Sequence, residues 1–214
     1  MLLAGALMTL AVSLSAFLLG IALGTAAALA KLSRHRLLRC IGIAYTTVIR
    51  GIPELPVIYL FFFGTSSLIM AVVRAAFGYD GYIEVNAFTV AVLALGLISG
   101  AYSTEVIRGG IASVSKGQME AAAALGLRRW MIWLRILLPQ AMRYALPGLA
   151  NVWQLTLKDT ALISVTGLAE GATREPFLFY AAAAMLYLLL TWGSSRFFSK
   201  AEASANRGFA ARSK

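Results

Sequence analysis

Long apolar runs alternate with short polar segments along the whole chain. A helix that crosses the hydrocarbon core of a bilayer needs roughly 20 consecutive apolar residues. Five segments meet this requirement, and no long soluble module lies between them. The pattern therefore predicts an all-α integral membrane protein with five transmembrane helices, at about 4–30, 53–73, 87–107, 144–166 and 177–198.

The basic residues gather on one side of these predicted spans. With the N-terminus outside, the cytoplasmic segments are about 31–52, 108–143 and 196–214, and they contain all but three of the 19 lysines and arginines. Cytoplasmic segments of membrane proteins carry an excess of Lys and Arg, so we expect the N-terminus to lie outside. The three exceptions are Arg74 and Arg174, which fall outside, and Lys158, which falls within the fourth predicted span.

One transmembrane domain is expected over residues 1–198, followed by a short polar cytoplasmic tail over residues 199–214. A cleaved signal peptide is the competing interpretation of residues 1–30. That segment has no basic residue ahead of its apolar run, and the run is about twice as long as the apolar core of a signal peptide. We therefore expect the first segment to be a retained span.

Composition agrees with a membrane protein and argues against several other classes. The chain has 214 residues, of which 60% are hydrophobic and 13% charged, more apolar surface than a soluble domain of this size could bury. The formal charge of +10 is explained by the orientation in the membrane, so no nucleic-acid partner is expected. Cys40 and His35 are the only residues of their kinds, which excludes a disulfide within the chain and argues against a metal centre built on Cys and His.

The cytoplasmic segment 108–143 is the most informative part of the sequence. "EAAAAL" from Glu120 strongly favours a helix, and Gly126 is a natural end for it. The next stretch, "RRWMIWLRILLPQ", carries arginines that can reach lipid headgroups. A short exposed helix held under the membrane suits docking by another protein, and a surface helix that merely links two spans is the alternative. Four large apolar residues share helical spacing in this stretch: Trp130, Trp133, Ile136 and Leu137.

The same segment resembles the signature of a transporter family. Residues 120–139 match the pattern E-A-A-x(3)-G-x(9)-I-x-L-P, which is typical of the permease subunits of bacterial ABC importers. Other segments resemble the polar amino-acid subfamily, above all permeases for histidine, lysine, arginine, ornithine or opines. The likeness runs from about residue 5 to 200 and is carried by "RGIPELP" (50–56), "SGAYSTEVIRGGI" (99–111), "LPQAMRYALPGLANVWQ" (138–154) and "KDTALISV" (158–165).

The resemblance implies a coupling helix from Glu120 to Gly126, seated on a cytoplasmic ATPase. Glu120 would face the ATPase, Ala121 and Ala122 would permit close approach, and Gly126 would provide the turn. The sequence contains no G-x-x-x-x-G-K-[ST] phosphate loop, so the chain itself is not expected to be an enzyme. ATP and Mg would be bound by the partner ATPase, and this chain would hold no cofactor and no metal.

Lys158 and Asp159 lie next to each other in the fourth predicted span. Charges at mid-bilayer cost at least about 2.5 kcal/mol each, so these side chains should avoid lipid. Neighbours on a helix point about 100° apart and cannot simply neutralise each other. The helix therefore either lines a translocation pathway or holds a subunit interface. The residues expected along the pathway are Asn151, Gln154, Lys158, Asp159, Thr160 and, from the third span, Tyr102.

Pro53 and Pro56 stand at the start of the second predicted span. Proline lacks a backbone donor and clashes with the preceding turn, which predicts a broken or kinked start. A loop that ends at a proline-capped helix is the alternative. Glu54, between the two prolines, would then be a solvated side chain.

Two pairs on the third predicted span have ordinary interpretations. Gly96 and Gly100 form a small-xxx-small pair that could pack against a neighbouring helix. Glu105 and Arg108 are spaced three residues apart, as expected for an ion pair on a helix surface.

The chain departs from the resembled family at two places. Some relatives carry an acidic residue where this chain has Val152, so selection of cationic side chains would fall to the partner subunit or to other residues. After Glu170 the family has about nine further residues, whereas here "GATREPF" follows directly. The outer loop is therefore expected to be trimmed, or its residues to be missing from the chain.

These observations predict the transmembrane subunit of an ATP-driven ABC importer in the bacterial inner membrane. Its substrates would be polar or basic amino acids or opines, moved by alternating access. Its partners would be a second permease subunit, in a hetero- or homodimer, two ATPase subunits, a solute-binding protein outside and the lipid bilayer. An ion-coupled carrier or channel with Lys158 and Asp159 as an intramembrane relay is the alternative, although no internal repeat of the carrier kind is visible.

Overall fold

The computed structural model describes residues 2–78, 86–167 and 176–206, and these ranges contain helices and no strand. The predicted all-α membrane-type fold is therefore confirmed at this level. The helices are α1 (Leu2–Leu32), α2 (Arg36–Gly51), α3 (Glu54–Phe77), α4 (Ala87–Ala112), α5 (Lys116–Ala124), α6 (Arg129–Ile132), the π-helical segment η1 (Trp133–Leu137), α7 (Leu138–Gly167) and α8 (Pro176–Asn206).

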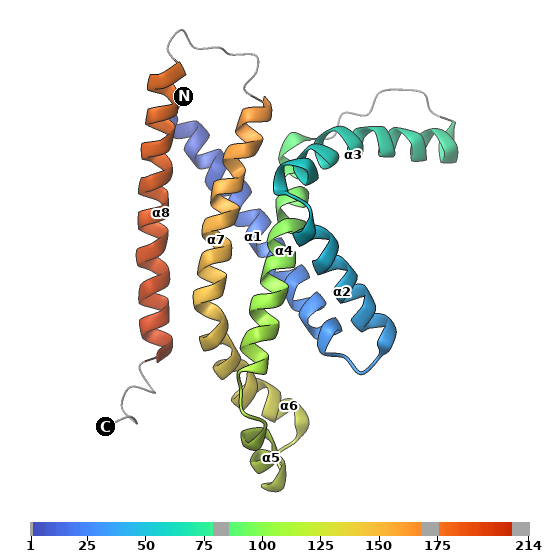
Figure 1. Cartoon of the computed structure of the whole chain (residues 1–214), viewed down its shortest axis with the longest axis vertical. Helices are drawn as coiled ribbons and strands as arrows, with labels where there is room; N and C mark the ends of the chain where they lie inside the picture. Colours follow the sequence, from blue (N-terminus) through green and yellow to red (C-terminus); the bar gives the residue numbers. More distant parts are fainter. Residues whose placement is uncertain (1, 79–85, 168–175, 207–214) are drawn as a thin grey trace.

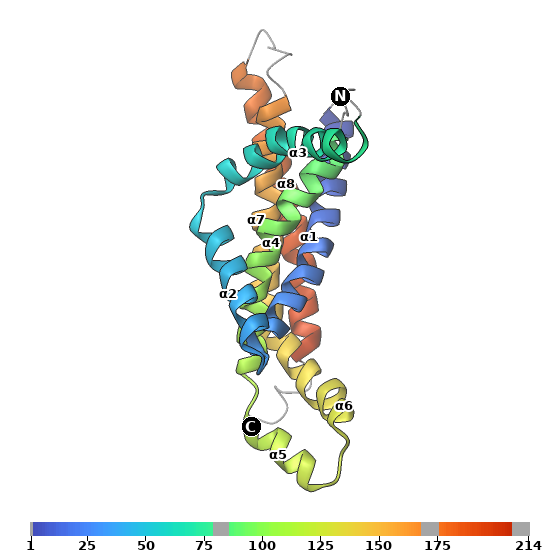
Figure 2. The same cartoon turned by 90° about the vertical axis from the view of Figure 1, so that its right-hand side faces the viewer.

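The core of the bundle lies between α1 and α4, and α7 packs against both helices (Figure 1). Glycines let α1 and α4 approach closely: a Cβ atom at Gly20 would lie 1.9 Å from the Ser99 hydroxyl oxygen. The predicted packing role of Gly96 and Gly100 is confirmed, because a Cβ at Gly96 would meet Leu19 of α1 at 2.6 Å. α8 packs along α7 on the other side, which Figure 2 shows from a second direction.

α2 is a helix that the hydrophobic pattern does not reveal. The segment 31–52 was expected to be a charged cytoplasmic connection, yet Arg36–Gly51 is helical and packs against α1 and α4. Its pattern is amphipathic rather than apolar. The Tyr45 hydroxyl donates a hydrogen bond of 2.7 Å to the Leu97 carbonyl of α4, which fixes the position of α2 on the bundle.

The predicted break at Pro53 is confirmed. The segments Arg36–Gly51 and Glu54–Thr65 meet at an angle of 102°. Pro53 has a fixed φ of −56°, and the residue before a proline is driven out of the helical region, as the extended Ile52 shows. α3 consequently runs across the direction of α4 and α7 (Figure 1).

The segment between α4 and α7 forms a compact helical turn at one end of the bundle. α5 ends at Ala124, and the chain turns at Gly126 as predicted, with a φ of 77° that is readily adopted only by glycine. The backbone N–H groups of Gly126 and Leu127 then bond back to the carbonyls of Ala123 and Ala122, at 3.0 and 3.2 Å.

The predicted apolar face after Gly126 is only partly correct. Trp130 and Trp133 are exposed, but Leu137 is buried on another side of the helix. The reason is the π-helical turn η1, which is wider than an α turn and rotates later residues relative to earlier ones. This wide turn lies just before Pro139, whose ring would crowd the preceding carbonyls of a regular α-helix.

Among the described residues, two helices are long and apolar enough to cross a membrane on their own: α1 from Gly5, and α4. The bent pair of α2 and the first part of α3 would count as a third span. α8 remains helical to Asn206, so the first part of the expected tail is helix. The turn after α1, the α5–α6 segment and the C-terminal end of α8 lie toward one end of the bundle (Figure 1).

Candidate functional site

The break between α2 and α3 places two opposite charges beside α4. Arg50 is in the last turn of α2 and Glu54 is the first residue of α3. Because Pro53 forces the chain out of the helix between them, the two side chains reach the same region from different helices. Glu54 is therefore part of a polar contact, contrary to the expectation of a solvated side chain.

Tyr102 of α4 joins these two residues. Its hydroxyl donates a hydrogen bond of 3.0 Å to the Glu54 carboxylate. The Arg50 guanidinium lies over its ring, 5.3 Å from the ring centre, in a cation–π contact. The predicted pathway residue Tyr102 thus bridges a cation and an anion.

Asp159 of α7 completes the group. Its side chain is only 7% exposed, and it lies near enough to the Glu54 carboxylate for the two negative charges to repel each other. In the described part of the chain no ion pair joins it to Lys158. We call Arg50, Glu54, Tyr102 and Asp159 the junction cluster, since they come from four helices that meet at this point.

A cavity of about 480 Å³ adjoins the junction cluster. Its lining includes Arg50 and Tyr102 of that cluster, and the remaining lining residues are Lys31, Thr46, Thr47, Gly51 and Glu105. Both charges and hydroxyl groups line it, so it is suited to a small polar ligand rather than an apolar one.

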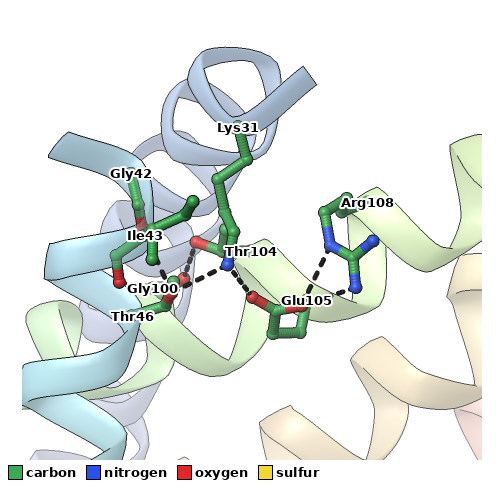
Figure 3. A network of polar contacts seen from close by, with 8 residues as sticks. All are labelled: Lys31, Gly42, Ile43, Thr46, Gly100, Thr104, Glu105 and Arg108. Carbon is green, nitrogen blue, oxygen red and sulfur yellow. Dashed lines mark hydrogen bonds and ion pairs between the residues drawn. The ribbon is translucent and has the colours of Figure 1, made fainter. Parts of the chain in front are cut away.

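A network of ion pairs forms part of the cavity lining that α1 and α4 contribute. The Lys31 ammonium contacts the Glu105 carboxylate and donates a hydrogen bond of 2.9 Å to the Thr46 hydroxyl (Figure 3). The predicted pair of Glu105 and Arg108 is confirmed, with 2.9 Å between guanidinium and carboxylate. This network links α1, α2 and α4, which makes Glu105 more than an ordinary surface residue.

The residues predicted along the pathway do not form a single stripe. Tyr102 and Asp159 belong to the junction cluster, but Gln154 and Thr160 turn toward α8. The Gln154 amide donates a hydrogen bond of 3.0 Å to the Ser195 hydroxyl, and the Thr160 hydroxyl lies 3.3 Å from the Tyr187 hydroxyl. Asn151 and Lys158 lie on an exposed face of α7. Their exposure fits a contact outside this subunit better than a place in the junction cluster.

The predicted coupling residues lie together on α5 and the turn that follows it. Glu120 and Ala121 are exposed, whereas Ala122 is buried against the rest of the chain. Only one of the two alanines is thus available for close approach by a partner. The expected trimmed loop after Glu170 lies outside the described residues.

Comparisons with known proteins identify the family of the chain. Residues 17–199 match the family described as "binding-protein-dependent transport system inner membrane component". The chain belongs to this family. It is 49% identical over 213 residues to the nopaline transport system permease protein NocQ of Agrobacterium fabrum, covering 95% of this chain and 90% of the relative.

Two further likenesses support the assignment. The permease is 41% identical over 196 residues to the histidine/lysine/arginine/ornithine transport system permease protein HisQ of Escherichia coli, covering 87% of this chain and 85% of that one. It also resembles a chain in the crystal structure of an amino acid ABC transporter with histidines, at a TM-score of 0.77 and 32% identity over 94% of this chain and 92% of the other. The resemblance stated from the sequence is thereby confirmed, and the alternative of an ion-coupled carrier is not favoured.

The sequence pattern did not indicate that Arg50, Lys31 and Thr46 belong to this candidate site. Arg50 and Lys31 were counted only as cytoplasmic charges. A signal existed, because Arg50 and Glu54 flank the proline that breaks the helix. Within the described ranges, no group of three or more His, Cys, Asp or Glu side chains could hold a metal ion.

Proposed function

We propose that this permease forms part of the pathway of an ATP-driven importer for basic amino acids or opines. The relatives whose names carry nopaline and histidine, lysine, arginine and ornithine support this substrate class. The observation on which the proposal rests is the junction cluster, whose Arg50 and Tyr102 line a polar cavity. Behind them, the Glu54 carboxylate accepts a hydrogen bond from Tyr102 and Asp159 adds a second carboxylate.

The charges of the junction cluster complement an amino acid. Arg50 would bind the substrate carboxylate, since a guanidinium offers two parallel donors to a carboxylate. Glu54 and Asp159 would bind the substrate's ammonium or a cationic side chain. Val152 is buried in an apolar cluster, so these two carboxylates would supply the negative charge that some relatives place at the position of Val152.

The pathway would open and close by alternating access between two packings of the bundle. The Lys31–Glu105 contact joins the end of α1 to α4 and lines the cavity. Its separation would let these two helices move apart and widen the cavity. Asn151 and Lys158 on the exposed face of α7 would meet the second permease subunit, so that no charge faces lipid.

The proposed arrangement in the membrane has five spans and an external N-terminus. α7 and α8 would cross the bilayer in addition to α1, the α2–α3 pair and α4. The Glu120–Gly126 segment would dock on one of two ATPase subunits, which bind ATP and Mg, and a solute-binding protein would deliver substrate at the opposite face. Exposure of Glu120 and Ala121 at one end of the bundle supports this role.

Uptake by the complete transporter in proteoliposomes tests the proposal. Asp159→Asn and Glu54→Gln should each lower ATP-dependent uptake of arginine by about tenfold or more, because a charge-assisted hydrogen bond contributes roughly 1.5–3 kcal/mol. Glu202→Gln, which neutralises a carboxylate near the end of α8, is the matched control and should retain uptake. Normal uptake by both cluster variants would show that substrate passes elsewhere.

A further inference from the structure

A second cavity lies where the turn after α1 faces α5 and α6. Its volume is about 500 Å³. Arg34 comes from the turn between α1 and α2, and Arg129 is the first residue of α6, so two segments distant in sequence each bring a guanidinium to it. The other lining residues are Met119, Glu120, Ala123, Ile132 and Trp133.

The two guanidiniums of this cavity are not neutralised by the chain itself. Both side chains are exposed, and among the described residues neither lies within 4.0 Å of a carboxylate oxygen. Glu120 lines the same cavity with one negative charge against two positive ones. The cavity therefore has a net positive charge, and the planar guanidinium is suited to binding the oxygens of a phosphate.

Exposed apolar side chains lie close in sequence to both arginines, and one of these side chains, Trp133, lines the cavity. Leu32, Leu37 and Leu38 surround Arg34 in sequence, and Trp130 and Trp133 follow Arg129. Tryptophan is enriched at the depth of lipid headgroups, where its ring is partly apolar and its N–H is hydrated. A bilayer would cover these leucines and indoles while leaving the two arginines at the level of the phosphates, whereas the surface of a soluble protein would have to match both kinds of group.

We propose that this cavity binds the phosphodiester headgroup of an anionic phospholipid, held between Arg34 and Arg129. This inference goes beyond the transport function and uses only the proposed orientation, in which this end of the bundle meets the cytoplasmic leaflet. Because Glu120 lines the same cavity, the bound lipid would lie directly against the proposed coupling helix. An anionic leaflet would then order the surface that the ATPase meets.

Native mass spectrometry of the complete purified transporter, titrated with phosphatidylglycerol in detergent, tests this site. Arg34→Gln and Arg129→Gln should each weaken phosphatidylglycerol binding about fivefold, the effect of one basic residue near an anionic surface. Arg128→Gln removes the same charge from the neighbouring residue, which does not line the cavity, and should change binding less than about twofold. Binding of phosphatidylcholine should be the same in all four proteins.

Three results would overturn the proposal. Equal losses of phosphatidylglycerol binding in Arg128→Gln and Arg129→Gln would indicate that the positive surface attracts the lipid without a defined site. Displacement of the lipid by soluble glycerol phosphate at the same concentration would indicate a site for free phosphate esters. Loss of ATPase subunits from the Arg34→Gln and Arg129→Gln complexes, with lipid binding unchanged, would assign the cavity to the ATPase. Lipid binding is measured without ATP or substrate, so its failure is distinct from a failure of the uptake assay.

Discussion

At the residue scale, the junction cluster depends on one phenol that contacts two opposite charges. The Tyr102 hydroxyl orients the Glu54 carboxylate, and its ring supports the Arg50 guanidinium. A charge taken out of water is costly unless it is paired, and the half-buried Glu54 obtains its partner from this phenol. Under the proposed function, a bound substrate would replace part of these contacts.

Tyr102→Phe separates the two roles of this residue. The ring stays under Arg50, but the hydrogen bond to Glu54 is lost, which costs about 1 kcal/mol. The apparent KM for arginine uptake should therefore rise roughly fivefold, with little change in the maximal rate. Tyr59→Phe removes a hydroxyl from an exposed position of α3 and should leave KM unchanged. An unchanged KM in Tyr102→Phe would mean that Glu54 is positioned by other groups.

Glu105 joins three helices, so its replacement should lower the stability of the protein. Glu105→Gln leaves the Lys31 ammonium, whose side chain is only 14% exposed, without its carboxylate. Bonds to charged groups contribute about 1.5–3 kcal/mol, so the unfolding temperature of the detergent-purified protein should fall by roughly 3–10 °C. Arg108→Gln removes the more exposed partner of Glu105 and should lower the unfolding temperature less. Equal shifts in the two variants would show that the contact between Lys31 and Glu105 does not contribute to the unfolding temperature.

At the scale of elements, the bundle is held by close contact between α1 and α4. Gly20 and Gly24 of α1 face Ser99 and Ser103 of α4 with no space for a further carbon atom. In a bilayer the hydrophobic effect does little to drive helix association, because lipid tails are as apolar as the side chains. Close approach of the two helices provides van der Waals contact, which stabilises their association instead. The α1–α4 pair is therefore the frame on which α2 and α7 place their charged residues.

Gly20→Ala tests this contact. The added Cβ would lie 1.9 Å from the Ser99 hydroxyl oxygen, and overpacking of this kind costs about 1–3 kcal/mol. The fraction of folded protein after detergent extraction, measured by size-exclusion chromatography, should fall. Adding Ser99→Ala to the Gly20→Ala chain removes that oxygen and should restore part of the folded fraction. Gly193→Ala adds a Cβ where nothing lies within 4 Å and should be neutral or stabilising. A folded fraction unchanged in Gly20→Ala would contradict tight α1–α4 packing.

Much of this arrangement of helices follows from the sequence, but the site does not. Apolar runs of about 20 residues predict the positions of α1, α3, α4, α7 and α8 because local hydropathy alone decides them. This criterion does not detect the amphipathic α2, because α2 has no long apolar run. It also gives no information on the contact of α2 with α4 through Tyr45. The junction cluster depends on that contact, since Arg50 reaches Tyr102 only when α2 lies against the bundle.

At the scale of the whole molecule, different segments lie at the two ends of the bundle. The Arg-bearing turn after α1 and the α5–α6 segment lie together at one end, while the start of α4 lies at the other (Figure 1). α4 has 26 residues, or roughly 39 Å of helix, which is enough to cross the hydrocarbon core of about 30 Å. Ala87 at its start and Ser115 just after its end should therefore lie on opposite sides of the membrane.

Labelling with a membrane-impermeant maleimide tests this orientation. Cys40 is the only cysteine, so Cys40→Ser gives a background without thiols. In that background Ala87→Cys should react in intact spheroplasts, and Ser115→Cys only in inside-out vesicles, because Lys and Arg retain their segments in the cytoplasm. Both positions are exposed, so a lack of reaction reflects the membrane rather than burial. Labelling of Ser115→Cys from outside would show that the bundle has the opposite orientation. α5 would then lie on the side of the membrane without an ATPase, which would contradict both the proposed coupling and the lipid site beside it.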